Sequence, residues 1–410
     1  MKNEILAFLN DPEQLEKMYR SNKVLFKKEF VLLYPEIIGN PVADTWNERL
    51  SYESDAISWG NGKELFVIIA ASLLAGLIAK IPAIFALDEE FFYPRNIGFV
   101  LFPLLAAYFS WKNSLPKGKI AIIAGAMLAG LVFINSLPLP ETDTLILSCI
   151  HLILFLWAVT GFAFVGGIRE SNKRRLEYLK YNGDLVVMTT LILIAGGIMS
   201  AVTIGLFELI GFKIEEFYFS YFGIFGLAAA PIIATYLTQT NPQLVGKVSP
   251  VIAKIFSPLV LVMLLVFLGA MIMSGKDPYN DREFLIIFNA LLVGVMAIIF
   301  FSVAGTLKGT KSRAEIWILL LLSVITIVVN SIALSAILFR ISEWGITPNR
   351  AAVLGANILI LINLIMVTAH LYKFLAKKTD PEDIGNAIAR YLPVYVIWTV
   401  IVTFIFPLIF

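Results

Sequence analysis

A short run late in the chain combines charged groups with the residues of a helix start. Arg340 and Arg350 flank Glu343, so two cations and one anion lie close together in the sequence. Thr347 followed by Pro348 is typical of a helix N-cap and its first helical residue. Arg350 is therefore expected in the first turn of a helix, where it adds to the positive end of the helix dipole. Such a site could receive an anionic group, for example a lipid phosphate or a carboxylate.

The same run has a second interpretation that involves no ligand. Arg340 and Arg350 could extend to the lipid head groups, with Glu343 paired to one of them. Gly345 and Thr347 would then only shape a short connection. Both interpretations stay open from the sequence.

Amide side chains in the neighbouring apolar stretches extend this candidate site. Asn357 follows Arg350 by seven residues, so the two share a face of the expected helix and could line a polar path. Hydrogen bonds between helices explain such residues equally well. The densest set of polar positions within these stretches is Asn289, Asn330, Ser331, Ser335, Asn357 and Asn363.

A cluster of acids offers a different chemistry. Asp88, Glu89 and Glu90 lie shortly before Arg95, and a carboxylate there could act as a base or hold a divalent cation. A solvated acidic surface is the simpler interpretation. We predict no catalytic residue, metal ion or cofactor, because the chain has one cysteine and two histidines and no phosphate-binding loop, dinucleotide fingerprint or His-Glu-x-x-His motif.

Composition places these groups in a membrane protein. Of the 410 residues 59% are hydrophobic and only 15% are charged, and the mean hydropathy is +0.83, whereas about a quarter of the residues in soluble proteins are charged. About 20 helical residues cross a bilayer, so we predict an all-α polytopic transmembrane helix bundle. Its approximately eleven spans cover residues 65–87, 97–111, 119–137, 144–168, 185–210, 217–238, 251–273, 284–306, 315–340, 351–373 and 391–410. The second span is short and contains Pro103, so it could be re-entrant.

The distribution of basic residues predicts the orientation of these spans. With the amino terminus inside, 25 of the 32 Lys and Arg residues fall in inner segments and six in outer loops. Short cytoplasmic loops retain Lys and Arg. We therefore predict a cytoplasmic amino terminus and a carboxyl terminus outside. The net charge of +2 gives no reason to expect a nucleic-acid partner.

Residues 1–64 are polar and form the predicted cytoplasmic segment, followed by a transmembrane domain over residues 65–410. Asp11 and Pro12 predict the start of an amphipathic helix that ends before Pro35. A second short helix is expected over residues 42–52. The segment could pack on the ends of the spans. Alternatively, the basic face within residues 12–33 could bind a cytoplasmic protein or anionic lipid.

The run from Arg340 to Arg350 also carries a family resemblance. Its pattern Arg-Ile-x-Glu-Trp-Gly-Ile-Thr-Pro-Asn-Arg resembles the uncharacterised bacterial membrane family called domain of unknown function 4153. The resemblance covers mainly residues 250–375. It implies a multi-pass protein of the bacterial cytoplasmic (inner) membrane and supplies no agreed activity, substrate or catalytic residue.

Three functions remain open from the sequence. The first is a transporter or permease-like protein that handles a lipid or a small anionic ligand, with membrane lipids as partners. The second is a non-catalytic sensor or assembly subunit. The third is a membrane-embedded transferase on a lipid-linked substrate, with the acids at residues 88–90 as its reactive groups. The absence of a large soluble outer domain from the predicted layout makes an enzyme the least favoured of the three.

Overall fold

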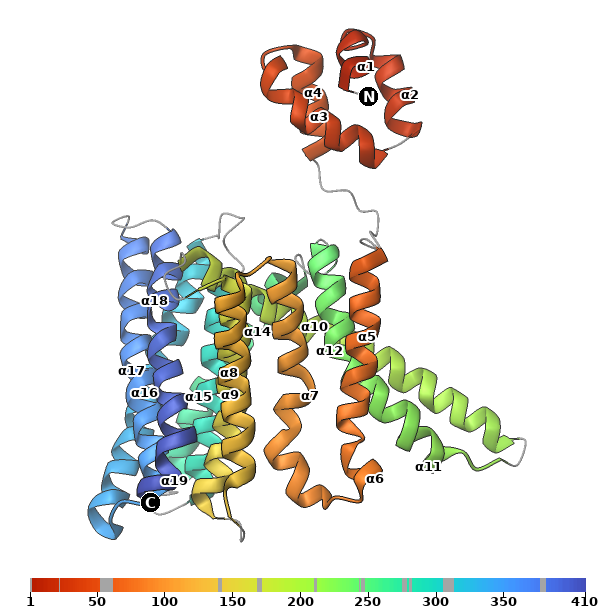
Figure 1. Ribbon diagram of the computed structural model, residues 1–410. Coiled ribbons are helices and arrows are strands. Elements are labelled where there is room, and N and C mark those ends of the chain that lie inside the picture. The colour runs from red at the N-terminus through yellow and green to blue at the C-terminus, as the bar shows by residue number, and fades with distance from the viewer. Residues whose placement is uncertain are drawn as a thin grey trace. The chain divides into compact units, whose positions relative to one another are not determined.

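The computed structural model describes an all-helical chain (Figure 1). Every secondary-structure element in the described residues is a helix, which confirms the predicted fold class. The described residues are 2–21, 23–51, 62–138, 142–167, 172–209, 212–242, 244, 248–274, 279, 282–304, 313–376 and 381–410.

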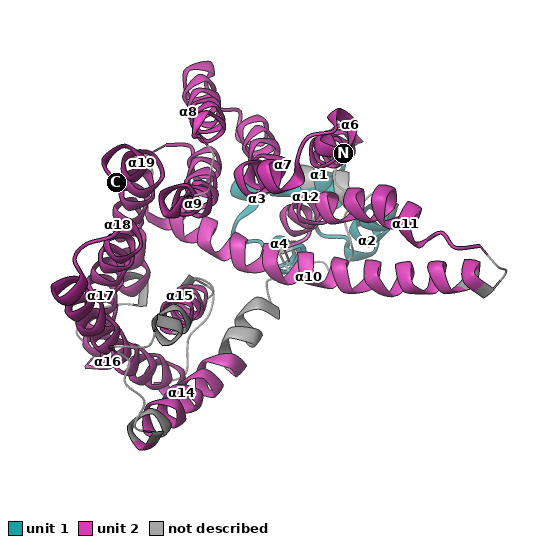
Figure 2. Cartoon of the chain, turned by 90° about the horizontal axis from the view of Figure 1, so that it is seen from below, with its two compact units in different colours: residues 1–58 teal, residues 59–410 magenta. Residues whose placement is uncertain are grey.

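The chain divides into two compact units, residues 1–58 and residues 59–410 (Figure 2). Unit 1 contains helices α1 (Lys2–Ala7), α2 (Pro12–Ser21), α3 (Lys23–Ile37) and α4 (Pro41–Ser51). Its own core is built around Leu15, Phe26, Phe30 and Trp46. The Asp11 side chain accepts hydrogen bonds from the backbone N–H groups of Glu13 and Gln14, at 3.1 and 3.2 Å, so Asp11 caps α2 as predicted.

One local prediction for unit 1 was wrong. A single helix was expected from Asp11 to just before Pro35, but α2 ends at Ser21 and Pro35 lies inside α3. Pro35 occupies the last turn of α3, where its missing N–H removes only one backbone hydrogen bond. The Tyr34 hydroxyl also donates to the Asp44 carboxylate of α4 at 3.0 Å, which holds this turn in place.

The charges of unit 1 are largely balanced within it. Residues 1–58 contain ten acids and seven bases. Lys17 pairs with Glu13 at 2.9 Å, and both Arg20 and Arg49 bind Glu16. Hydrogen bonds from Arg20 and then Arg49 lower the pKa of the Glu16 carboxyl. The basic face expected for binding anionic lipid is thus partly neutralised by neighbouring acids.

Unit 2 consists of long helices joined by short connections. They are α5 (Gly62–Ala79), α6 (Ile81–Phe85), α7 (Glu89–Lys112), α8 (Lys117–Ser136), α9 (Asp143–Val165), α10 (Asn172–Leu209), α11 (Glu215–Tyr218), the π-helix η1 (Phe219–Gly223), α12 (Ile224–Thr240), α14 (Val248–Ser274), α15 (Arg282–Ala304), α16 (Arg313–Trp344), α17 (Pro348–Leu375), α18 (Pro381–Val400), the π-helix η3 (Ile401–Ile405) and α19 (Phe406–Ile409).

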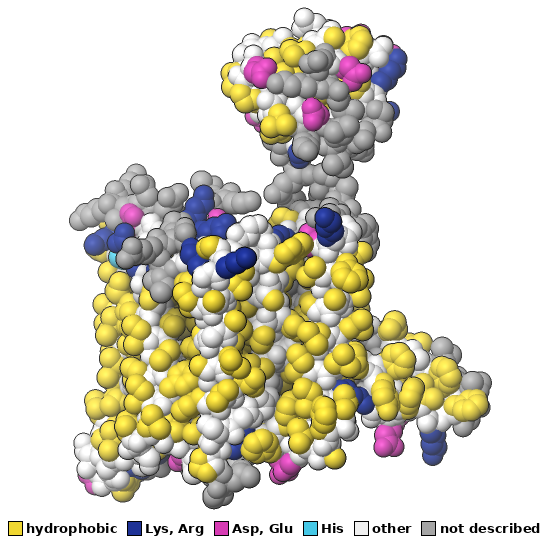
Figure 3. Space-filling model, in the orientation of Figure 1, with side chains coloured by type: hydrophobic (Ala, Val, Ile, Leu, Met, Phe, Trp, Pro, Cys, Tyr) yellow, Lys and Arg dark blue, Asp and Glu magenta, His cyan; other side chains and the backbone are white. Residues whose placement is uncertain are grey.

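Eight segments among the described residues are long and apolar enough to cross a membrane. The remaining three of the eleven predicted spans coincide with α7, α14 and α15. Within α14 and α15 the described apolar stretches Ile255–Gly269 and Phe288–Val303 are shorter. Figure 3 shows hydrophobic side chains covering the middle of unit 2 on the visible face, with Lys and Arg gathered at its upper end. Unit 2 is therefore a polytopic helix bundle.

The short second span is a continuous helix in the structure. Helix α7 runs for 24 residues through both Pro94 and Pro103, a length of about 36 Å at 1.5 Å per residue. It begins eight residues before the predicted boundary at residue 97. Arg95, assigned to a loop from the sequence, therefore lies inside the helix.

Helix α10 contributes to both of the two largest hydrophobic cores in the described part of unit 2. Leu176 and Leu179 of α10 pack in the core built mainly from α14 to α18. Tyr178 and Tyr181, on another face of α10, pack in the core built from α5, α7, α8, α9 and α12. Figure 2 shows α10 running between these two groups of helices. The second core fixes α7 against α9, which is where the candidate site lies.

Candidate functional site

The loop between α16 and α17 has the predicted helix start. The Thr347 hydroxyl accepts a hydrogen bond from the backbone N–H of Arg350 at 3.4 Å, and Pro348 is the first residue of α17. Gly345 has a φ of +74°, a conformation that favours glycine and turns the chain between the helices. The N-cap prediction for Thr347 is confirmed.

Both arginines near this loop donate hydrogen bonds to backbone carbonyl oxygens. Arg350 Nη1 donates to the carbonyl oxygens of Trp344 and Gly345, at 2.9 and 2.7 Å. Trp344 is the last residue of α16 and Gly345 follows it, so Arg350 neutralises the negative end of that helix dipole. Arg340 Nε donates to the Tyr279 carbonyl at 2.8 Å. Both arginines also lie beside the Trp344 ring.

Glu343 is exposed and forms no ion pair with either arginine among the residues that the structure describes. The ion pair between Glu343 and one of the two arginines, considered from the sequence, is therefore not observed. Ligand binding stays a prediction for the five residues proposed from the sequence, which are Arg340, Glu343, Thr347, Arg350 and Asn357.

The buried amides join helices to one another. Asn330 Nδ2 of α16 donates to the Asn357 carbonyl of α17 at 3.0 Å. Asn363 of α17 donates to the Tyr395 hydroxyl of α18, also at 3.0 Å. Asn289 lies half-buried on α15. The structure thus brings Asn330 and Asn357 together and directs Asn363 to a different helix, as the interpretation by interhelical hydrogen bonds expects.

The acids before α7 have a local structural role. Asp88 Oδ1 accepts a hydrogen bond from the backbone N–H of Glu90 at 2.9 Å, which makes Asp88 the N-cap of α7. Glu89 and Glu90 are exposed. No group of three or more His, Cys, Asp or Glu side chains in the described part of the chain is placed to hold a metal ion.

Arg95 is the residue that sequence reasoning placed wrongly. Its side chain is only 2% exposed. Nη1 donates to the Phe91 carbonyl at 3.3 Å, and the guanidinium lies 4.2 Å from the centre of the Phe91 ring. Nε and Nη2 are buried with no hydrogen-bond partner, and no carboxylate in the described residues pairs with this cation.

The neighbours of Arg95 fix the rotation of α7. The Tyr93 hydroxyl donates to the carbonyl of Ala79, the last residue of α5, at 3.1 Å. Asn96 exchanges two hydrogen bonds with Asn135 of α8, at 3.0 and 2.9 Å. Tyr93 and Asn96 are three residues apart and so lie on one side of α7. Because successive residues are about 100° apart on a helix, Arg95 points away from that side and lines the gap to α9.

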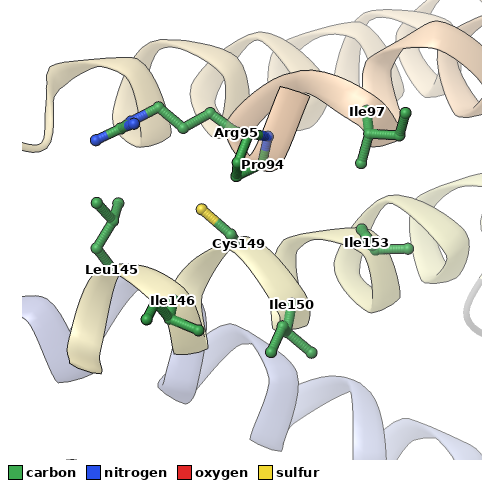
Figure 4. A pocket seen from close by; sticks show the side chains of 8 residues that line it. All are labelled: Pro94, Arg95, Ile97, Leu145, Ile146, Cys149, Ile150 and Ile153. Carbon is green, nitrogen blue, oxygen red and sulfur yellow. The ribbon is translucent and has the colours of Figure 1, made fainter. Parts of the chain in front are cut away.

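A cavity of about 250 Å³ lies between α7 and α9 beside Arg95. It is lined from α7 by Pro94, Arg95 and Ile97, and from α9 by Leu145, Ile146, Cys149, Ile150 and Ile153. In Figure 4 the Arg95 side chain extends toward Leu145, whereas Ile97 and Ile153 lie at the opposite end. The cavity thus has one cationic end and one apolar end.

Gly98 allows α7 and α9 to approach each other closely beyond the apolar end of this cavity. A Cβ added at Gly98 would lie 2.8 Å from Leu156 Cδ1 of α9. The sequence signal that could have located the site is a cation directly before an apolar run. The sequence did not show that Arg95 lies within a helix, because the start of α7 at Glu89 was not predicted.

Comparisons with known proteins identify no relative. No protein-family model matches the chain, no curated protein matches it, and no solved structure matches it. The resemblance to domain of unknown function 4153 therefore stays a prediction. Functional interpretation depends on the physical chemistry of the site.

Proposed function

We propose that this chain is a permease-like multi-pass protein of the bacterial inner membrane that binds an anionic ligand at Arg95. This proposal rests on the burial of the Arg95 guanidinium, whose Nε and Nη2 have no hydrogen-bond partner. An uncompensated buried charge costs several kcal/mol, and an unsatisfied buried N–H group adds to that cost. An anion at this position would offset both.

The position of Arg95 along α7 suits an anion from the membrane surface. Arg95 lies six residues after Glu89, about 9 Å into the helix at 1.5 Å per residue. With Glu89 at the membrane surface, that depth would place Arg95 near the boundary between lipid head groups and hydrocarbon. Phosphate and carboxylate are the groups that a guanidinium binds with two parallel hydrogen bonds.

The proposed orientation has a cytoplasmic amino terminus and places Arg95 toward the outer surface. After replacement of Cys149 by alanine, a cysteine at Thr142 should react with a membrane-impermeant maleimide in intact cells. A cysteine at Asn172 should not react, because α10 begins at the end of the bundle where basic residues gather. Labelling at residue 172 without labelling at residue 142 would reverse this orientation.

A sensor or assembly subunit is the second candidate function. It is favoured by unit 1, which is a compact unit with a hydrophobic core of its own. In this alternative the ligand at Arg95 would be sensed, and residues 12–33 of unit 1 would contact a cytoplasmic protein. The transferase is not pursued, because Asp88 already serves as the cap of α7.

Ligand binding at Arg95 can be tested through thermal stability in a neutral detergent. Anionic phosphatidylglycerol should raise the melting temperature of the wild type, whereas zwitterionic phosphatidylcholine should raise it much less. Arg95→Gln should lose the difference between the two lipids. Arg350→Gln is the matched control, because Arg350 already binds the carbonyls of Trp344 and Gly345.

The comparison of the two arginine variants decides the outcome. Loss of the lipid difference in Arg350→Gln, with retention in Arg95→Gln, would transfer the ligand to the loop before α17. Equal lipid responses in the wild type and both variants would show that neither arginine binds the head group, and the proposal would be wrong.

A further inference from the structure

We infer that the ligand at Arg95 is an anionic amphiphile, with a small phosphate or carboxylate head at the guanidinium and an alkyl chain along Ile97, Ile150 and Ile153. This inference rests on the proposed function, since it names the ligand class for the same site. It goes further by requiring a chain as well as a charge.

The head-group end of the cavity follows from the direction of the Arg95 side chain. Nη1 turns back to the carbonyl of Phe91, one helical turn closer to the start of α7. In Figure 4 the guanidinium reaches over Leu145, near the start of α9. Both helices begin at the same end of the bundle (Figure 1). Nε and Nη2 therefore lie toward that membrane surface, where anionic head groups are found. Because both atoms are buried, a neighbouring side chain must shift for a head group to reach them.

The opposite end of the cavity has the character of a lipid chain site. Apart from Arg95, its lining is made of proline, leucine, isoleucine and cysteine side chains. Ile97, Ile150 and Ile153 are 49%, 54% and 36% exposed, so this end is open along the side of the bundle. A chain could enter sideways from the bilayer without leaving hydrocarbon.

The two ends have the spacing and direction of a lipid in one leaflet. Ile153 follows Leu145 by eight residues, which is about 12 Å along α9 at 1.5 Å per residue. The cationic end faces the membrane surface, and the apolar end points toward the middle of the bilayer. A cavity of about 250 Å³ is smaller than the ~300–1,000 Å³ that encloses a whole drug-sized ligand. It accommodates the first part of a chain, with the remainder in the surrounding lipid.

A small inorganic anion fits these observations less well. It would use the guanidinium but leave the row of isoleucines without a role. A longer chain concentrates the amphiphile in the bilayer beside the open end of the cavity, because more of its apolar surface leaves water. An amphiphile with a longer chain should therefore occupy the site at a lower total concentration.

The single cysteine of the chain provides a reporter that needs no engineering. Cys149 lines the cavity, is 8% exposed, and points toward α7 in Figure 4. The protein is reconstituted in phosphatidylcholine nanodiscs, and the rate of Cys149 alkylation by N-ethylmaleimide is measured by mass spectrometry. Dodecyl phosphate should slow alkylation at least tenfold at saturation. Hexyl phosphate should require a higher concentration, and inorganic phosphate should have no effect.

Matched variants separate the charge from the chain. Arg95→Gln should lose protection by dodecyl phosphate, and Ile150→Trp should weaken protection by dodecyl phosphate more than by hexyl phosphate. Leu154→Trp is the control, because Leu154 is exposed on α9 and does not line the cavity. Each variant is compared with its own rate without ligand. Dodecyltrimethylammonium serves as a cationic amphiphile of equal chain length and should give no protection.

The outcomes distinguish this inference from the proposed function. Equal protection by inorganic phosphate and dodecyl phosphate, lost in Arg95→Gln, would overturn the amphiphile and leave an anion site at Arg95. Equal protection by the cationic and anionic amphiphiles would show a site with no charge preference, and both proposals would be wrong. Protection that stays unchanged in Arg95→Gln would also overturn both.

Discussion

Replacing Arg95 with methionine should stabilise the lipid-free protein and abolish its stabilisation by anionic lipid. In the lipid-free state the Arg95 charge is buried, and Nε and Nη2 have no partner. Methionine has a similar length, carries no charge and adapts its shape to the surrounding side chains. Replacement of buried ionic groups by apolar residues has stabilised other proteins by about 1–4 kcal/mol, and we expect a gain in this range.

The sign of this effect is informative because it reverses when lipid is present. In phosphatidylglycerol the wild type gains binding energy that Arg95→Met cannot gain. The free energy of unfolding is measured by titration with urea in a neutral detergent, with and without phosphatidylglycerol. A lipid-free Arg95→Met protein that is several kcal/mol less stable than the wild type would mean that the guanidinium is already satisfied within the fold.

Replacing Gly355 with valine should strongly destabilise the contact between α17 and α18. A Cβ at this position of α17 would lie 2.1 Å from Cη2 and Cζ2 of Trp398 on α18. The Trp398 ring is rigid, and its edge-to-face contact with Phe406, with centroids 6.0 Å apart, limits where it can move. Overpacking of this kind costs typically 1–3 kcal/mol, and we expect a loss of about 3 kcal/mol.

Gly125→Val provides the control for this prediction. Gly125 lies within α8, and a Cβ there would meet nothing within 4 Å. The two substitutions share the same loss of glycine from a helix, so their difference isolates the contact with Trp398. Yield of monodisperse protein and unfolding in sodium dodecyl sulfate are the measurements. Equal behaviour of the two variants would contradict the packing of α17 against α18.

Local patterns were sufficient to predict many helix starts and the helical class. Asp11 before Pro12 and Thr347 before Pro348 act as caps because an N-cap depends only on residues within one turn. Long apolar runs indicate helices in the same local way. The start of α7 was missed because Pro94, Arg95 and Asn96 lower its hydropathy. Asn96 is buried there by Asn135, which lies 39 positions away in the sequence.

Partners across space explain why the candidate site was predicted only in part. Arg350 and Arg340 were recognised as cations near a helix end, but backbone carbonyls accept their hydrogen bonds. Every residue has a backbone carbonyl, so the residue types do not indicate which one is the acceptor. Asn330 likewise binds the Asn357 backbone. For Arg95 the missing information is its orientation. The sequence near it does not indicate that Tyr93 contacts α5 and Asn96 contacts α8, which directs Arg95 toward α9.

Native mass spectrometry of the protein extracted from its membranes tests the Arg95 site most directly. Wild type, Arg95→Gln and Arg350→Gln are purified in parallel in a neutral detergent, and the lipids that remain bound are identified by mass. If the site lies at Arg95, we expect one bound anionic amphiphile per chain in the wild type and in Arg350→Gln, and no bound amphiphile in Arg95→Gln. Retention of the same anionic lipid by Arg95→Gln, at the same occupancy, would contradict it.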